Sequence, residues 1–375
     1  MGRGLYAKTD FKTGDLVLVE KPCLIGPNFS NQFVFCSQCL AVAWTGIPCE
    51  TCHDFIFCSL KCKNKAWKEH HHMECSLTPH LLLCDPEIPD YIFMSLKFII
   101  SLIKDNKAID ELKSKLKISK NNQVKIVNDK PEQKIDLFNK LMSLSHKLAL
   151  DCSMRLTIHT VKILICMVKY STFFSDKLKD MQYNDLSTNE DFMFIGSLLL
   201  RLVKINRVNN HDISDIAELS ISQCLDIKAG RIDRSRGCCV GLISSMTNHS
   251  CVPNIRRCFS EDMKYIFYAL EPIASGTQLL DAYGDFFYLS PLMHRREKRK
   301  NFVCQCIACE EDWPPVLLSP LIDEAKYFTE LGFINEIVDV LPQPSTTRCL
   351  LLQALEAIYE KYYGLAVPFD NLCSF

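Results

Sequence analysis

Residues 36–75 read CSQCLAVAWTGIPCETCHDFIFCSLKCKNKAWKEHHHMEC, and this stretch decides how the chain must fold. Zinc prefers four nitrogen or sulfur ligands in a tetrahedron, and a closely spaced cysteine pair supplies two of them from one tight turn. The stretch therefore holds enough ligands for two zinc ions in one small module. The predicted ligands are Cys36, Cys39, Cys49, Cys52, Cys58, Cys62, His71 and Cys75.

Consecutive histidines precede Cys75, and only one of them has the spacing of a ligand. The pattern H-x-x-x-C joins His71 to Cys75, whereas His70 and His72 project in other directions on a helical turn. We therefore predict that His71 binds metal and that its removal unfolds the module. Removal of His70 is expected to be close to neutral.

A further ligand set combines two distant segments of the chain. The motif C-Q-C-I-A-C at 304–309 lacks one ligand of a complete zinc site, and the motif N-H-S-C-V-P-N at 248–254 contains a cysteine that can supply it. The sequence thus predicts a third zinc site. Its ligands are Cys251, Cys304, Cys306 and Cys309.

The alternative interpretation is that these are ordinary cysteines in a chain that contains 21 of them. The remaining cysteines are scattered, and we interpret them as small buried apolar residues. A disulfide framework needs a secretory context, but the sequence shows neither a signal peptide nor a membrane-spanning run. The closely spaced pairs therefore favour zinc and a reducing compartment, which is the nucleus, the cytoplasm or both.

The composition is typical of a protein with a sizeable core. The chain has 375 residues, of which 48% are hydrophobic and 23% are charged, so we expect two or three packed lobes. The net charge of −1 excludes a chain-wide basic surface for nucleic acid. A local basic run at 294–300 is either the solvated face of a helix or a nuclear-targeting signal.

Hydrophobic patterning divides the chain into strand-forming and helix-forming parts. Residues 5–20 predict two short strands around the turn K-T-G-D, and strand-forming segments return after Gly237. Helical periodicity predicts helices within 90–104 and 136–213, and a C-terminal helical tail that can hold one hairpin. Residues 105–135 predict a helix followed by a mobile surface loop.

The order of the motifs resembles that of the SET–MYND (SMYD) family of protein-lysine methyltransferases. The motifs are G-R-G-L at 2–5, the cysteine-rich module, N-H-S-C-V-P-N, D-A-Y-G at 281–284 and C-Q-C-I-A-C. The resemblance covers residues 1 to about 313. The run Y-G-D-F-F-Y at 283–288 is most similar to the tetratricopeptide-bearing SMYD branch and its arthropod relatives, and the tetratricopeptide part is absent from this sequence.

The resemblance implies an α+β fold, in which a split SET β-fold carries a double-zinc MYND insert, a helical insert, a post-SET zinc site and a short helical C-terminal tail. In such MYND modules the zinc pairs interleave, so that Cys36, Cys39, Cys58 and Cys62 share one ion and Cys49, Cys52, His71 and Cys75 share the other. The implied domains are the N-terminal SET part at 1–35, the MYND module at 36–75, the helical linker and insert at 76–215, the core SET domain at 216–290, the post-SET segment at 291–313 and the helical C-terminal region at 314–375.

The resemblance also implies an activity, the transfer of a methyl group from S-adenosylmethionine to a lysine of a histone or non-histone protein. Tyr283 of the Y-G motif matches the family's catalytic tyrosine at the mouth of the lysine channel; the alternative is a buried strand tyrosine. Phe302 matches an aromatic residue of the methyl-transfer channel, or is a core phenylalanine. The matching cofactor-binding positions, with Phe302 grouped among them, are Arg3, Gly4, Asn209, Ser245, Asn248, His249 and Phe302.

Two of these positions have simpler alternatives. Asn209 would also suit the C-cap of a helix, and the Ser245 hydroxyl would also suit a buried structural hydrogen bond. In addition, the family's G-x-G-L-Y-P reads G-C-C-V-G-L at 237–242, so that Cys239 replaces a glycine. The chain also begins one residue before Gly2, where the family has a preceding strand.

These departures leave a second function open, that of a zinc-stabilised interaction protein whose MYND module binds proline-containing peptides. The methyltransferase interpretation instead predicts a lysine-bearing protein as the partner. Under either interpretation we expect a monomer in the nucleus and cytoplasm, without nucleic-acid or membrane partners.

Overall fold

The computed structural model divides the chain into two compact units. The strand unit comprises Met1–Lys21, Ser214–Arg234 and Met246–Phe375, and the helical unit comprises Pro22–Ile213 and Ser235–Ser245. The structure describes residues 3–85, 88–103, 109–113, 134–215, 234–284, 286–299, 302–316 and 331–366. The helix and loop predicted for 105–135 lie largely outside these ranges.

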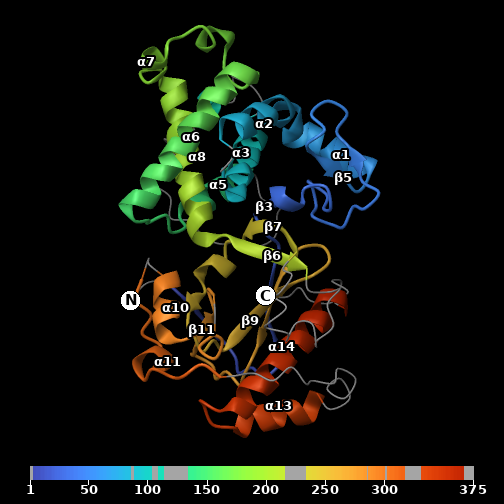
Figure 1. Cartoon of the computed structure of the whole chain (residues 1–375), viewed down its shortest axis with the longest axis vertical. Helices are drawn as coiled ribbons and strands as arrows, with labels where there is room; N and C mark the ends of the chain where they lie inside the picture. The colour runs from blue at the N-terminus through green and yellow to red at the C-terminus, as the bar shows by residue number, and fades with distance from the viewer. Residues whose placement is uncertain are drawn as a thin grey trace. The chain divides into compact units, whose positions relative to one another are not determined.

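Two three-stranded sheets form the centre of the strand unit (Figure 1). Their strands are β1 (Leu5–Tyr6), β2 (Leu16–Glu20), β8 (Asn248–His249), β9 (Ile255–Phe259), β10 (Tyr265–Ala269) and β11 (Gln278–Asp281). Strand β10 lies between β2 and β9, antiparallel to both, and is buried along its whole length because Y-I-F-Y-A is a continuous apolar run. Strand β11 lies between β1, which is antiparallel to it, and β8, which is parallel to it.

Helices complete the strand unit towards the C-terminus. They are α10 (Leu292–Lys298), α11 (Ile307–Glu310), α13 (Leu331–Val340) and α14 (Thr346–Ala366). Helix α14 packs on β9, where the buried carboxylate of Glu356 accepts a hydrogen bond from the Tyr288 hydroxyl at 3.2 Å and lies 3.6 Å from Arg256 Nε. Helices α13 and α14 form the hairpin predicted for the tail.

The helical unit is built around long helices that pack against one another. Its helices after the cysteine-rich module are α2 (His72–Cys84), α3 (Asp90–Leu102), α5 (Lys134–Met142), α6 (Leu150–Tyr170), the short turn η3 (Asp176–Leu178), α7 (Tyr183–Leu186) and α8 (Glu190–Asn209). Helix α8 packs on both α3 and α6, and Asn189 caps its N-terminus by accepting from the Phe192 N–H at 3.0 Å. Fully buried apolar residues such as Ile99, Ile163 and Leu199 form the core between these helices.

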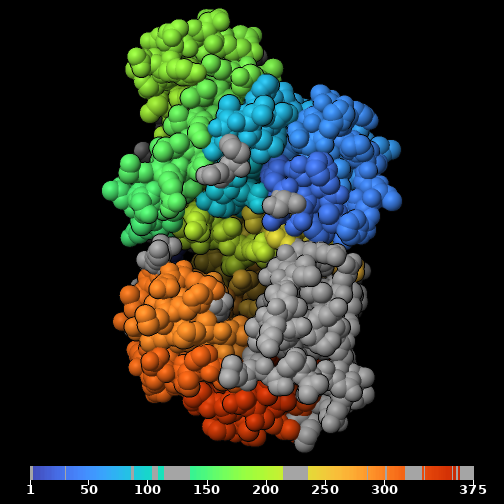
Figure 2. Space-filling view, viewed as in Figure 1, coloured from blue at the N-terminus to red at the C-terminus, as the bar shows by residue number. Residues whose placement is uncertain are grey.

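The cysteine-rich module occupies the N-terminal part of the helical unit. Its elements are η1 (Phe29–Asn31), the hairpin of β4 (Ile47–Pro48) and β5 (Ile56–Phe57), α1 (Leu60–Ala66) and the π-helical turn η2 (Trp67–His71), which continues into α2. In Figure 2 the module, in blue, lies beside α3, in cyan, and Lys97 of α3 donates to the Ser37 carbonyl oxygen at 2.8 Å. The module is therefore tied to the helices by a hydrogen bond as well as by chain continuity.

The predicted α+β fold is confirmed, but part of its strand content was not predicted. A third sheet, in the order β3–β7–β6, consists of β3 (Leu24–Pro27), β7 (Arg234–Val240) and β6 (His211–Asp215). Strand β6 lies within the segment that was expected to be a helical insert. It was not predicted because H-D-I-S-D has a single apolar residue, and only pairing with the neighbouring strand makes it extended. Among the described residues, no helix has the length and apolar composition needed to span a bilayer.

Candidate metal centres and active site

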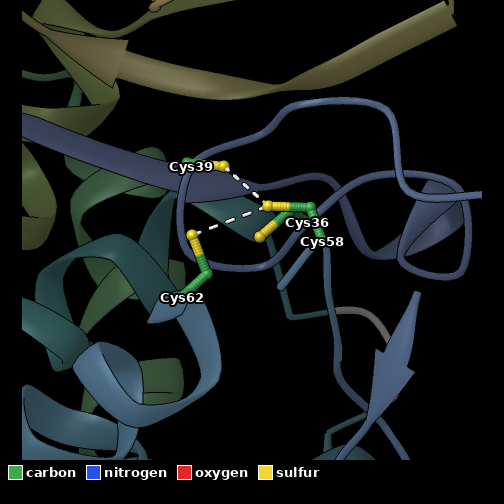
Figure 3. Close-up of side chains that lie close together, drawn as sticks. All are labelled: Cys36, Cys39, Cys58 and Cys62. Atoms are coloured by element: carbon green, nitrogen blue, oxygen red, sulfur yellow. Dashed lines mark hydrogen bonds between the residues drawn. The ribbon is translucent and has the colours of Figure 1, made fainter. Parts of the chain in front are cut away.

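The first ligand set gathers four sulfur atoms from two separate stretches of the module. Cys36 and Cys39 precede the β4–β5 hairpin, Cys58 follows it, and Cys62 lies on α1, whose N-terminus is capped by the Ser59 hydroxyl. Cys58 Sγ lies 3.6 Å from both Cys39 Sγ and Cys62 Sγ, and the side chains converge on one point (Figure 3). A zinc ion about 2.3 Å from each sulfur spaces the sulfurs about 3.8 Å apart, so these distances fit a zinc tetrahedron and not a disulfide.

The second ligand set interleaves with the first along the chain. Cys49 and Cys52 lie between the two halves of the first set, and their partners His71 and Cys75 lie on the continuous helix formed by η2 and α2. Cys49 Sγ lies 3.7 Å from Cys75 Sγ, and Cys52 Sγ lies 3.7 Å from His71 Nε2. The π-helical turn ends at His71, as π-turns frequently do at functional residues.

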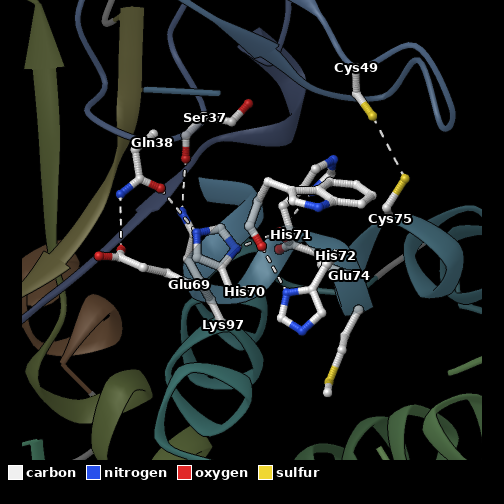
Figure 4. A network of polar contacts seen from close by, with 12 residues as sticks. Ser37, Gln38, Cys49, Glu69, His70, His71, His72, Glu74, Cys75 and Lys97 are labelled. Carbon is white, nitrogen blue, oxygen red and sulfur yellow. Dashed lines mark hydrogen bonds and ion pairs between the residues drawn. The ribbon is translucent and has the colours of Figure 1, made fainter. Parts of the chain in front are cut away.

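A buried carboxylate supports the histidine ligand, and the sequence did not reveal it. Glu74 Oε2 lies 3.3 Å from His71 Nδ1 and 3.0 Å from His70 Nδ1 (Figure 4). Burial disfavours the charged form, but the histidine contacts and the positive charge of Lys97 hold the pKa of Glu74 below its ordinary value. A carboxylate on the free nitrogen of a zinc-binding histidine fixes the ring orientation and raises its basicity.

His70 and His72 differ in their surroundings, although neither joins the ligand set. His70 is only 4% exposed, and its Nε2 lies 3.0 Å from Gln38 Oε1, so it connects Glu74 to the loop that carries the first ligand pair. The exposed His72 contacts only the Trp67 carbonyl oxygen through its ring, at 2.8 Å. The expectation that removal of His70 is neutral is therefore revised, because this side chain belongs to a buried polar network.

The third ligand set joins two segments of the strand unit. Cys251 Sγ lies 3.9 Å from Cys304 Sγ and 3.4 Å from Cys309 Sγ, and Cys306 completes the group. Two arginines of the predicted basic run lie against it: Arg299 Nη1 donates to Cys251 Sγ at 3.1 Å, and Arg295 Nη2 lies 3.9 Å from Cys309 Sγ. Four thiolates around one Zn²⁺ leave a net negative charge, which these guanidinium groups offset.

Arg295 is the exception to the solvated helix face expected for the basic run, since His294, Arg296 and Lys298 are exposed. Its side chain is fully buried and donates to the carbonyl oxygens of Phe287 and Ser290 at 2.9 and 2.8 Å. A further donor, Nη2, reaches the Ala308 carbonyl oxygen at 3.2 Å, beside Cys309 of α11. Arg295 therefore holds the zinc segment to the preceding loop from inside the core.

These three ligand groups predict three zinc ions per chain. Within each group all ligand atoms lie within 4.8 Å of one another, which one ion can bridge. Elemental analysis of the folded, dialysed protein is expected to give three zinc ions per chain. A value of two or fewer would exclude at least one of the assigned sites. If the zinc content of a Cys251→Ser variant then equals that of the parent, the excluded site is the third one.

The strand pairing β1–β11–β8 brings the two ends of the SET-like motif set together. Leu5 pairs with Leu279, and Leu280 pairs with Asn248, so the G-R-G-L segment and the N-H-S-C segment lie on opposite sides of β11. Asn248 Nδ2 donates to the Arg3 carbonyl oxygen at 3.0 Å. This hydrogen bond joins two of the predicted cofactor-binding residues, Arg3 and Asn248, which are far apart in the sequence.

Gly4 lies against the amide groups of two side chains. A Cβ atom at this position would lie 2.3 Å from Gln278 Nε2 and 2.8 Å from Asn248 Nδ2, closer than real Cβ atoms approach. Its absence leaves the backbone of this segment in close contact with the amide of Asn248.

Tyr283 follows β11 and is held at both ends. Its backbone N–H donates to His249 Nδ1 at 3.0 Å, and its hydroxyl donates to the Thr247 carbonyl oxygen. The residue is 48% exposed, yet burial of its hydroxyl end, aided by the negative charge of Asp281, raises the pKa of Tyr283 to about 12. The phenol is therefore protonated at neutral pH and acts as a hydrogen-bond donor, and the alternative of a buried strand tyrosine is wrong.

Three rings form an aromatic cluster around this tyrosine. The His249 ring centroid lies 5.3 Å from that of Tyr283 and 5.7 Å from that of Phe302, and the last two are 6.2 Å apart. Phe302 is 42% exposed and so is not a simple core phenylalanine. Burial, with the charge of Arg299 as the second cause, lowers the pKa of His249 to about 4, so the imidazole is neutral.

The other two predicted cofactor residues lie in the helical unit. Asn209, at the last position of α8, donates from Nδ2 to the carbonyl oxygens of Ser145 and Ile205, both at 2.7 Å. The Ser245 hydroxyl donates to the Gly241 carbonyl oxygen at 2.5 Å. Their donors therefore have structural partners, and their proposed contacts with a cofactor stay predictions.

The altered G-C-C-V-G-L segment lies largely in β7 of the helical unit. Cys239, where the family has a glycine, pairs with Ile25 and is fully buried, and its thiol lies 3.7 Å from the His211 carbonyl oxygen. The helical unit therefore accommodates the extra side chain within its sheet.

Two residues of the strand unit that the sequence left without a role now have one. The side-chain amide of Asn254 makes two hydrogen bonds with the backbone of β11. It donates to the Gln278 carbonyl oxygen and accepts from the Leu280 N–H, each at 2.8 Å. Asp281 is fully buried, pairs with Arg257 and accepts from the Ala282 N–H at 2.8 Å. Both residues were visible in the quoted motifs, but only strand pairing reveals what they contact.

Known proteins are similar in sequence to most of this chain. The histone-lysine N-methyltransferase SMYD3 of Mus musculus is 23% identical over 318 residues, which are 82% of this chain and 59% of that protein. The protein-lysine N-methyltransferase SMYD4 of Mus musculus is 22% identical over 364 residues, which are 83% of this chain and 45% of that protein. The chain thus spans about half the length of these two relatives.

A third relative is similar in size. A SET and MYND domain-containing protein of Dictyostelium discoideum is 23% identical over 330 residues, covering 83% of this chain and 80% of the relative. The sequence profile of the SET domain matches residues 2–284, which hold the split strand segments, the cysteine-rich module and the Y-G motif. By this match, and by the pairing of β1, β8 and β11 around Tyr283, the chain belongs to the SET domain family.

Proposed function

We propose that this protein is an S-adenosylmethionine-dependent protein-lysine N-methyltransferase. The observation that carries the proposal is the convergence, within the strand unit, of the Arg3–Gly4 segment with Asn248 and of Tyr283 with His249 and Phe302. A chain that had kept only its zinc ligands for folding would not need this arrangement around an exposed tyrosine. The named methyltransferases among its relatives support the same reaction class.

The residues of the strand unit fit the chemistry of the cofactor. When bound, S-adenosylmethionine supplies a methyl group on a positively charged sulfur. Arg3, Gly4 and Asn248 would hold it, because the missing Cβ of Gly4 allows close backbone approach next to the amide of Asn248. The faces of Tyr283 and Phe302 favour a cation nearby, which suits a sulfonium and, before deprotonation, an ammonium group.

Tyr283 supplies alignment in this proposal and not covalent chemistry. Its one O–H donates to the Thr247 carbonyl oxygen, so the hydroxyl oxygen can accept an N–H of the substrate amine and orient it, but it cannot serve as a base at neutral pH. Because His249 and Thr247 fix its two ends, the ring presents one geometry to the substrate. Such fixed orientation lowers the barrier of a displacement reaction.

Finer assignments rest on the motifs and are part of the proposal. We place the chain in the tetratricopeptide-bearing SMYD branch on the run Y-G-D-F-F-Y, with lysines of histone or non-histone proteins as substrates. We further propose a monomer that resides in nucleus and cytoplasm. Asn209 and Ser245 are proposed as additional cofactor ligands on the family resemblance alone.

One observation favours a second function, peptide binding by the cysteine-rich module. Trp44 is 65% exposed and Phe33 is 59% exposed, and their chain neighbours are paired by a hydrogen bond from the Ala43 N–H to the Val34 carbonyl oxygen at 2.8 Å. Adjacent exposed apolar side chains of this size mark an interaction surface. Aromatic residues are the usual contact for proline-containing peptides. This function can accompany methyl transfer and does not replace it.

Calorimetric titration with S-adenosylmethionine tests the proposed function. The parent protein is expected to release or absorb heat with one-site stoichiometry. Gly4→Ala is expected to weaken binding about tenfold, because its Cβ displaces the amide groups of Gln278 and Asn248 from their present positions. Gly332→Ala is the matched control, since a Cβ on Gly332 of α13 meets nothing within 4 Å. No heat with the folded, zinc-loaded parent would refute the methyltransferase proposal and favour a pure interaction protein.

A further inference from the structure

The imidazole of His249 has a different partner on each nitrogen. Nδ1 accepts the backbone N–H of Tyr283 at 3.0 Å, and Nε2 lies 3.5 Å from Cys251 Sγ. The first partner belongs to the candidate active site and the second is a ligand of the third metal group. One side chain therefore contacts both sites.

The identity of these partners fixes the proton on the ring. A backbone N–H can only donate, so Nδ1 must be the bare nitrogen, and a neutral imidazole then carries its proton on Nε2. This N–H points to Cys251, whose sulfur is a strong acceptor when it is a metal-bound thiolate. Arg299 Nη1 donates to the same sulfur at 3.1 Å, so Cys251 has two donors beside it.

We propose that His249 is a positioning residue that couples the third zinc site to the orientation of Tyr283. Its consequence for methyl transfer rests on the function proposed above, whereas the coupling itself does not. Metal binding makes Cys251 a thiolate that accepts the Nε2–H, and this hydrogen bond holds the ring so that Nδ1 faces the Tyr283 N–H.

The surroundings of Tyr283 show why this one contact matters. Tyr283 is the second residue after the end of β11, so its N–H lies beyond the hydrogen bonds of the strand pairing. The His249 ring provides the acceptor instead. The hydroxyl is held separately by the Thr247 carbonyl oxygen, which lies on the same segment as His249. Phe302, close in sequence to the ligand Cys304, also packs on the imidazole with 5.7 Å between ring centroids. Movement of the zinc segment is therefore transmitted to the ring from two directions.

Two substitutions separate the two halves of the coupling. The amide of asparagine reaches roughly the position of Nδ1, so His249→Asn keeps an acceptor for the Tyr283 N–H and loses the donor to Cys251. The longer glutamine reaches roughly the position of Nε2, so His249→Gln keeps the donor to Cys251 and loses the acceptor. Neither readout below requires methyltransferase activity.

The first readout is zinc release to a colorimetric chelator, and the second is hydrogen exchange of the Tyr283 amide. In His249→Asn we expect one zinc of three to leave about tenfold faster, with Tyr283 still protected. In His249→Gln we expect Tyr283 to exchange about tenfold faster, with zinc release near that of the parent. His72→Asn, at an exposed histidine outside the ligand sets, is expected to change neither. Equal effects of the two His249 variants on both readouts would overturn the proposal.

A measurement on the parent protein covers the case in which both variants fail to fold. In protein labelled with ¹⁵N-histidine, His249 is expected to show a protonated Nε2 and a bare Nδ1. A protonated Nδ1 would overturn the proposal. If the parent shows the expected tautomer and the variants behave as above but no methylation is found, the coupling stands and only the proposed function fails.

Discussion

Replacing His71 with alanine is expected to release one zinc ion and unfold the module at 36–75. His71 provides one of four ligands of the second set, and its ring also packs edge-on against Phe55 with 4.8 Å between centroids. Structural zinc contributes on the order of 10–16 kcal/mol to the folding of small modules, which is comparable to the entire stability of a domain. Elemental analysis and near-ultraviolet circular dichroism of the variant measure both effects.

The neighbouring histidines provide matched controls that differ by a single position. His72→Ala is expected to be neutral, because its side chain is exposed. His70→Ala is expected to keep all the zinc but to cost about 1–3 kcal/mol, because it removes a partner from the buried Glu74 carboxylate. Equal zinc loss from all three variants would show that the assignment of His71 is wrong.

Tyr283→Phe is expected to lower the rate of methyl transfer by about 10²-fold with little change in cofactor affinity. The substitution removes the hydroxyl but keeps the ring that packs against His249 and Phe302. A group that acts on the reacting amine stabilises the transition state more than the bound ground state, so its loss lowers turnover and spares binding. Single-turnover methylation of a lysine-rich protein pool, combined with cofactor titration, separates the two quantities.

Asn248→Ala is the contrasting variant in the same experiment. Its amide holds the Arg3 carbonyl oxygen beside Gly4, so its removal is expected to weaken cofactor binding first. If Tyr283→Phe turns over as fast as the parent while Asn248→Ala loses affinity, Tyr283 is a structural residue and the assignment of its role fails.

The metal groups could be predicted because their information is local. Pairs such as Cys36–Cys39 and Cys49–Cys52 are close in sequence, and zinc chemistry restricts how such pairs combine. Cys251 could be added because C-Q-C-I-A-C lacks one ligand and N-H-S-C-V-P-N contains a cysteine that can supply it. Glu74 and Arg295 could not be found in this way, since charged side chains are usually solvent-exposed and only packing shows that these two are buried.

The strands show the same limit of local information. Strand β10 is a continuous apolar run and could be predicted, whereas β6 has one apolar residue and forms by pairing with distant chain. His249 was predicted only as a cofactor-binding residue. That its ring reaches both Cys251 and Tyr283 follows only from the parallel pairing of β8 with β11, which sets the register of His249 opposite Asp281.

The interleaving of the first two ligand sets has a consequence for metal loading. An ion held by Cys36, Cys39, Cys58 and Cys62 closes a loop that contains Cys49 and Cys52. Closing that loop shortens the flexible chain between these cysteines and the helix that carries His71 and Cys75. The second ion therefore binds with a smaller loss of conformational entropy. The same argument holds when the second site fills first. Positive cooperativity follows from the crossed connectivity alone, so scarce zinc is expected to leave a mixture of empty and doubly filled modules, with few that hold a single ion.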